Sequence, residues 1–221
     1  MDIVELVTEA DIADRFRRFL RRRQLPDCFL YTGPGARNWL DLDASPDFAV
    51  ARSLTDLLRA SCTDILDHIG PRHNFASIGV GEGRKEAILL REWTRRGRPT
   101  YYCVDISRPL VEAAVHNAAA IPVDTVGIVA FLEDLPTLAQ TWRRPLVLAL
   151  LGNNFCNYEP RWLLRLLREQ LTPEDRLLFD CHLVAGDAAE AELPYKSALN
   201  RRFNLGPLLH GGLPEDACRF D

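Results

Sequence analysis

The chain has 221 residues, of which 26% are charged and 47% hydrophobic, a balance typical of a folded globular domain. Its net charge of −4 argues against a general electrostatic attraction to nucleic acid. The first residues lack the apolar core of a signal peptide, and no apolar run approaches the roughly 20 residues that span a bilayer. We therefore expect a cytoplasmic protein with neither nucleic-acid nor membrane partners.

Six cysteines are scattered along the chain, without a C-x-x-C pair and without a histidine at metal-ligand spacing. Cys103 and Cys181 fall inside apolar runs, where a thiol behaves as a small buried hydrophobic group. We therefore expect free thiols, which suit a reducing compartment, and no metal site.

Residues 1–72 are predicted to form a helical N-terminal region. Ile12, Phe16 and Phe19 recur at helical spacing, and Pro46 after a serine is typical of the first position of a second helix.

From residue 73 onward, short apolar runs alternate with amphipathic stretches. Strands buried on both faces read as continuous apolar runs, and crossover helices separate them. The pattern predicts a doubly wound parallel α/β sheet in a domain of residues 73–221. Helix is expected over residues 187–193, continuing over 195–209 after Pro194. The five predicted strands are 75–80, 101–104, 126–131, 146–151 and 177–183.

A glycine-rich loop follows the first of these strands. Gly79, Gly81 and Gly83 are spaced G-x-G-x-G, which resembles the first motif of S-adenosylmethionine-dependent methyltransferases. A dinucleotide site would need its third glycine at the position of Arg84. Glycines in such a loop allow a tight turn and let a ligand approach the backbone.

The second strand ends in Asp105, about 20 residues after the last glycine. This spacing is expected for an acid that binds ribose hydroxyls, although Asp105 could instead cap the helix that follows. After the third strand, Phe131 stands where many methyltransferases contact adenine, and it could equally belong to the core. An acid often found there is replaced by Ala130 or Phe131, with Glu133 and Asp134 as candidate substitutes.

The fourth strand is followed by three asparagines within five positions, between Gly152 and Tyr158. Polar amides at the carboxyl end of a buried strand lie where open α/β sheets hold their ligands. A turn that forms hydrogen bonds within itself is the alternative interpretation.

This segment resembles a motif of the histidine Nα-methyltransferases of ergothioneine biosynthesis. Their loop reads G-[GST]-T-I-G-N-[FLY]-x-P, and residues 152–160 read G-N-N-F-C-N-Y-E-P. Residues 102–107 are similar to the family's Y-x-P-V-D-x-S. Tyr31, together with Gly35 and Ala36, is similar to the family's Y-D-x-x-G-S loop. Tyr195 is similar to its A-Y-D-D segment, and residues 203–205 are similar to its F-N-x-N-x-L segment.

The resemblance implies a Rossmann-like class I methyltransferase fold with S-adenosylmethionine as cofactor. It implies that Asn157 holds the α-amino group of a small amino-acid substrate, histidine first, and that Tyr31 acts with it in catalysis. Tyr195 and Tyr31 would line the substrate pocket, to which the N-terminal region contributes. The residues expected to bind the cofactor are Gly79, Gly81, Gly83, Asp105, Phe131 and Gly152.

The chain also departs from the family. The L-P-E-Y-Y-x-T-R segment corresponds to residues 44–52, which lack its tyrosine pair, and Cys156 and Asn154 replace a glycine and a threonine. Lys196 replaces an aspartate. The chain also ends soon after Asn204, so it is interpreted as a fragment, a shortened relative or a relative with another substrate.

The function predicted from these features is N-methylation of a small amine. A non-catalytic protein of the same fold that acts through partners is the main alternative, and a nicotinamide oxidoreductase is a third. An incomplete sheet would expose a strand edge, which predicts a homodimer.

Overall fold

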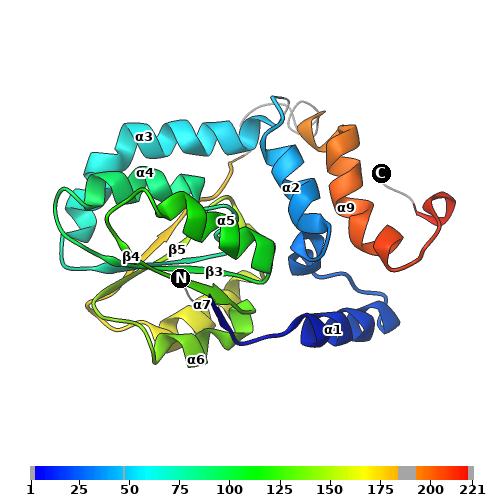
Figure 1. Ribbon diagram of the computed structural model, residues 1–221, viewed down its shortest axis with the longest axis horizontal. Helices are drawn as coiled ribbons and strands as arrows, with labels where there is room; N and C mark the ends of the chain where they lie inside the picture. The colour runs from blue at the N-terminus through cyan, green and yellow to red at the C-terminus, as the bar shows by residue number, and fades with distance from the viewer. Residues whose placement is uncertain (1–2, 47, 184–192, 219–221) are drawn as a thin grey trace. The chain divides into compact units, whose positions relative to one another are not determined.

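The computed structural model describes residues 3–46, 48–183 and 193–218 (Figure 1). Within them the chain forms two compact units. The sheet unit comprises Met1–Val7 and Ser53–Cys181, and the helical unit comprises Thr8–Arg52 and His182–Asp221. The units do not follow the predicted regions 1–72 and 73–221, because segments from both ends of the chain contribute to the helical unit.

In the described residues, six parallel strands form one sheet in the order β1-β4-β3-β2-β5-β6. The parallel α/β class is therefore confirmed. β1 was not predicted, because residues 1–72 were expected to be helical and three residues are too few to show a strand period. The strands are β1 Ile3–Glu5, β2 Asn74–Ile78, β3 Thr100–Asp105, β4 Asp124–Val129, β5 Leu146–Leu150 and β6 Arg176–Phe179.

Helices cover both faces of this sheet. α4 and α5 lie on one side, and α6 and α7 on the other (Figure 1). Alternate residues of β3 point to opposite faces, so Tyr101 packs with the first group and Tyr102 with the second. The helices of the sheet unit are α3 Ala49–Ile69, which begins in the helical unit, α4 Arg84–Trp93, α5 Arg108–Ala118, α6 Leu135–Ala139 and α7 Pro160–Gln170.

The chain reverses its direction of travel across the sheet at β2. β3 lies on one side of β2 and β5 on the other, which makes the carboxyl end of β2 a topological switch point. In open α/β sheets ligands bind at such points, outside the carboxyl ends of the strands.

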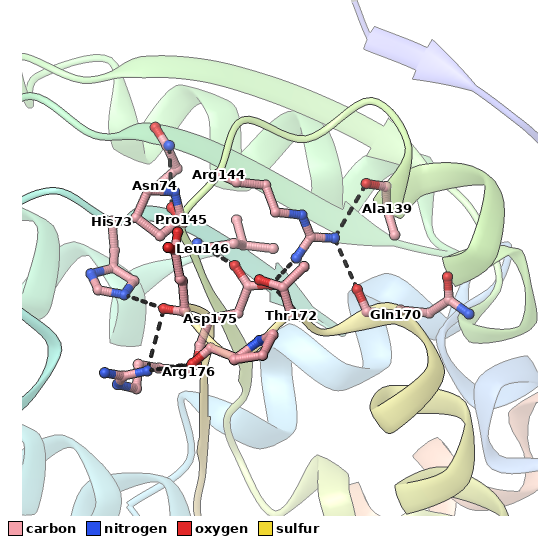
Figure 2. Close-up of polar contacts among 12 residues, drawn as sticks. His73, Asn74, Ala139, Arg144, Pro145, Leu146, Gln170, Thr172, Asp175 and Arg176 are labelled. Atoms are coloured by element: carbon pink, nitrogen blue, oxygen red, sulfur yellow. Dashed lines mark hydrogen bonds and ion pairs between the residues drawn. The ribbon is translucent and has the colours of Figure 1, made fainter.

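A polar network joins β5 and β6 at their amino ends, opposite the switch point (Figure 2). The Asp175 carboxylate accepts hydrogen bonds from the backbone N–H of Leu146 (2.7 Å), from the backbone N–H of Thr172 (2.7 Å) and from the Thr172 hydroxyl (2.8 Å). It also forms an ion pair with Arg144, whose guanidinium donates to the Gln170 carbonyl at 2.9 Å. Asp175 thereby joins the starts of two neighbouring strands to the end of α7.

The helical unit has a small core of its own, formed by Leu30, Leu42, Phe48 and Phe203. Of the predicted helix over 187–193, residues 187–192 lie outside the described residues, and Leu193 begins the short helix η4. The elements are α1 Glu9–Arg21, η1 Asp27–Tyr31, α2 Gly35–Asp43, η4 Leu193–Lys196, α9 Ala198–His210 and η5 Glu215–Ala217. Among the described residues, no helix has both the length and the apolar character needed to cross a membrane.

Candidate functional site

The glycine loop lies at the carboxyl end of β2, at the switch point. Gly79, Gly81 and Gly83 have φ angles of +65°, +59° and +74°, a region that residues with a Cβ rarely adopt. Gly83 is the N-cap of α4. The loop therefore presents bare backbone next to the amides of a helix N-terminus, a surface suited to a polar ligand.

Asp105 closes this loop from the neighbouring strand β3. One carboxylate oxygen accepts from the Gly81 N–H at 3.0 Å, and the other accepts from the Ser107 N–H at 2.9 Å. The bond to Ser107 stabilises the turn before α5, but the N-cap of that helix is Ser107 itself, so Asp105 is not the helix cap that the alternative supposed. A carboxylate has about four lone-pair sites, so these contacts leave capacity for a further donor.

Asp105 is only 7% exposed, and burial raises its pKa to about 6. The hydrogen bonds from Ser107 and Gly81 and the charge of Lys85 act in the opposite direction but do not offset burial. A rise of this size from the ordinary value corresponds to about 3 kcal/mol against the ionised form. Buried carboxyls with raised pKa values beside glycine loops are found more often at functional sites than elsewhere.

Phe131 follows β4 and is 4% exposed. Its backbone N–H donates to the Asp134 carboxylate at 2.9 Å, so Asp134 caps the turn that carries Phe131. Glu133 is exposed. Ala130 is buried and donates its N–H to the Asp105 carbonyl at 3.0 Å, which joins this segment to the end of β3.

The segment after β5, residues 151–157, is called the β5 loop here. Gly152 and Asn153 both have positive φ angles, +86° and +60°. The short helix η3 Asn154–Asn157 follows, and Asn157, the predicted amine ligand, is exposed at its end. The loop is thus a tight turn after the carboxyl end of β5, but its Asn154 amide bonds to Ile78 outside the loop and not within the turn, as the alternative interpretation supposed.

Asn154 links the β5 loop to the glycine loop. Its side-chain amide donates to the Ile78 carbonyl at 2.7 Å. The same amide lies over Gly79, where an added Cβ would approach the Asn154 Nδ2 to 2.0 Å. Gly79 is therefore required both by its backbone conformation and by the side chain packed against it.

Lys85, in the first turn of α4, brings a positive charge to the same edge. A Cβ on Gly152 would lie 3.4 Å from the Lys85 Nζ, so the ammonium stands beside the β5 loop. Burial raises the pKa of the Glu86 carboxyl, and the charge of Lys85 offsets part of that rise. Ser77 donates to the buried Glu86 carboxyl at 2.8 Å.

The predicted substrate residues Tyr31 and Tyr195 lie in the helical unit. Tyr31 packs against Trp39 and Phe203, with ring centroids 5.3 and 5.2 Å apart. Tyr195 contacts Phe48 at a centroid distance of 6.2 Å. Because Trp39 contacts both Phe48 and Phe203, the two tyrosines belong to one aromatic cluster.

The structure thus groups the predicted residues in two sets. The glycine loop, Asp105, Phe131, Gly152 and Asn157 lie at or just beyond the carboxyl ends of β2, β3, β4 and β5 in the sheet unit. Tyr31 and Tyr195 form a second set in the helical unit. Sequence reasoning overlooked the contacts of Lys85 and Asn154, and also Asp180 after β6, whose carboxylate accepts from the Gly152 and Asn153 amides.

The sequence profile of the histidine-specific, S-adenosylmethionine-dependent methyltransferases matches residues 9–208. The chain belongs to this family. The resemblance stated from the motifs is therefore confirmed: the family is one of methyltransferases whose cofactor is S-adenosylmethionine. The glycine loop and the buried Asp105 are consistent with that cofactor.

A curated relative of this family member is the N-methyltransferase fsqC of Aspergillus fumigatus. The two sequences are 25% identical over 202 residues, which represent 85% of this chain and 54% of the relative. The chain therefore spans about half the length of that relative.

Two solved structures of the plantazolicin methyltransferase BpumL have a similar fold. The structure in complex with SAH has a TM-score of 0.52 at 15% identity and covers 93% of this chain and 74% of that one. The structure with SAH and a triazolic desmethylPZN analog has a TM-score of 0.52 at 13% identity, covering 86% and 69%. The Rossmann-like methyltransferase fold is thereby confirmed.

Proposed function

We propose that this chain transfers the methyl group of S-adenosylmethionine to the amino group of a small amino-acid-like substrate, with histidine as the first candidate. The observation that carries the proposal is the Asn154–Ile78 hydrogen bond, which joins the β5 loop to the glycine loop at one edge of the sheet. Because the chain belongs to this family, we infer that the bond holds the loop that carries Asn157 against the glycine loop, where the cofactor is predicted to bind. No observation favours a non-catalytic role, and Arg84 breaks the dinucleotide spacing that an oxidoreductase would need.

Residues of the sheet unit would hold the cofactor, which supplies an already activated methyl group when bound. Gly79, Gly81 and Gly83, with their positive φ angles, would hold the loop in the turn that brings its backbone to the cofactor. Asp105 would accept hydrogen bonds from the ribose hydroxyls, and the Lys85 ammonium beside Gly152 would attract a carboxylate. Phe131 would contribute an apolar surface for the base.

The protein's contribution to the reaction is mainly alignment. The Asn157 amide oxygen would accept an N–H of the substrate amine and so direct its free lone pair towards the methyl group. Tyr31 and Tyr195, in the aromatic cluster of the helical unit, are further proposed substrate-binding residues. Correct positioning of two reacting groups is worth up to about 7–11 kcal/mol of barrier in favourable models.

Calorimetric titration with S-adenosylmethionine and S-adenosylhomocysteine (SAH) tests the cofactor site. We expect micromolar binding, weakened at least about tenfold in Asp105→Ala because the ribose hydroxyls lose a charged acceptor. Asp64→Ala, on the exposed side of α3, is the matched control. Failure of the wild-type chain to bind either ligand would refute the proposed site. Mass spectrometry would then follow methyl transfer to amines, histidine first.

The affinity for SAH is also expected to depend on pH. Since burial raises the pKa of Asp105 to about 6, the acceptor carboxylate is lost as the pH falls below that value. If binding requires the ionised form, affinity at pH 5 should be about tenfold lower than at pH 7.5. Asp105→Asn should remove this pH dependence, and an equally steep profile in that variant would show that another group titrates.

The prediction of a homodimer is based on an edge strand of the sheet: among the described residues, β6 pairs only with β5. We propose that this edge is covered by a second copy of the chain, since exposed strand edges tend to be paired or covered. Sedimentation of the purified chain would show whether it is a dimer. Location in the cytoplasm is likewise a proposal.

A further inference from the structure

The β5 loop depends on an unusual backbone conformation. Gly152 and Asn153 are consecutive residues with positive φ, and Asn153 carries a side chain. For a residue with a Cβ this conformation costs on the order of 1 kcal/mol. Interactions from outside the loop are therefore needed to hold it, because any relaxation of these two residues would redirect η3 and Asn157.

Asp180, which follows β6 directly, supplies such interactions. One carboxylate oxygen accepts from the Gly152 N–H at 2.6 Å, and the other accepts from the Asn153 N–H at 3.0 Å. Hydrogen bonds to a carboxylate are shorter and stronger than those between neutral groups. Both residues with positive φ are thus bound by one side chain.

Two further contacts place the chain after β6 alongside the β5 loop. The rings of Phe155 and Phe179 stack with centroids 4.5 Å apart, and burial together with the nearby Cys181 thiol raises the pKa of Cys156. Residues 179–181 therefore support the loop along its length. On the other side, the Asn154 amide fastens the loop to the Ile78 carbonyl.

We propose that Asp180 is a positioning residue for methyl transfer: it fixes the β5 loop, and through the loop it sets where Asn157 meets the substrate amine. This inference rests on the proposed function. Asp180 contacts one residue of the predicted cofactor site, Gly152, through its backbone N–H, but the hydrogen bonds described for its carboxylate reach neither Asp105 nor the glycine loop. Its loss should therefore affect alignment of the amine more than binding of the cofactor.

Asp180→Asn in the full chain tests this. The asparagine side chain keeps one acceptor oxygen but turns an NH₂ group towards the second backbone N–H, so one hydrogen bond is lost. We expect kcat for methyl transfer to fall about tenfold, since the loss of one hydrogen bond to a carboxylate accounts for a change of that order, while the Kd for SAH changes less than about twofold. Asp180→Glu, which restores the carboxylate, should recover part of kcat. Asp64→Asn is the control.

Hydrogen–deuterium exchange of the wild type and Asp180→Asn separates this inference from the proposed function. We expect faster exchange in the peptide covering residues 152–158 and unchanged exchange in β3. If exchange in 152–158 is unchanged, or if kcat and SAH affinity fall together, Asp180 has no positioning role. If the wild type neither binds SAH nor methylates an amine, the proposed function fails, and the exchange result still decides whether Asp180 holds the loop.

Discussion

Replacing Asp175 with alanine should lower the free energy of unfolding by about 3 kcal/mol. The substitution leaves a buried backbone N–H without its hydrogen-bond acceptor and breaks an ion pair. The Leu146 N–H, on a fully buried residue, would lose its acceptor, and so would Thr172. Arg144 would lose its carboxylate, although its side chain is 27% exposed and can regain water. For a chain of this size the change corresponds to a melting temperature lower by roughly 6–12 °C, measurable by calorimetry.

The effect of Asp175 should depend on pH in a defined direction. Burial alone would raise its pKa, but the hydrogen bonds from Thr172 and Leu146 and the charge of Arg144 outweigh it and lower the pKa. The stabilisation is therefore complete above the ordinary carboxyl pKa of about 3.9, and it is lost as the pH falls through the lower folded value. Asp216→Ala, exposed on η5, is the control. A melting temperature unchanged in Asp175→Ala would contradict the assigned role.

Gly79→Ala should disturb both the fold and the cofactor site. Its Cβ would lie 2.0 Å from the Asn154 Nδ2, and the residue would have to hold a φ of +65°. Displacing the Asn154 amide breaks its bond to Ile78, and the left-handed backbone adds to the cost. We expect a loss of about 2–3 kcal/mol in stability and at least about tenfold in SAH affinity.

Gly33→Ala is a matched control for this substitution. Gly33 also has a positive φ, +54°, but nothing lies within 4 Å of an added Cβ. Its variant should therefore show only the backbone contribution, about 1 kcal/mol, with SAH affinity unchanged. Equal effects of the two substitutions would mean that the contact with Asn154 contributes nothing.

The sheet could be predicted because its strands are buried on both faces. Apolar runs such as residues 146–150 are fully buried, so they are distinct in the sequence from the amphipathic helices between them. The glycine loop and Asp105 could be located for a related reason. Both lie at strand ends, where local spacing along the chain reflects position in space.

The contacts that hold the site together could not be predicted in this way. Asn154 bonds to Ile78 across 76 positions of sequence, and the pairing of Asp180 with Gly152 spans 28. Such contacts depend on which strands are neighbours, and the sequence pattern does not specify strand order. β1 was overlooked because its partner β4 lies far along the chain and its three residues show no period.

The pairing of β1 has a consequence for how the protein is made. Ile3 pairs with Gly127 and Glu5 with Val129, so the strand nearest the start of the chain has no partner until β4 has left the ribosome. At synthesis rates of about 5–20 residues per second, β1 waits for several seconds as an unpaired segment. Meanwhile β2 and β3 can already pair, since they are close in sequence. During translation the sheet is therefore expected to grow from its centre, with β1 added after β4 at one edge.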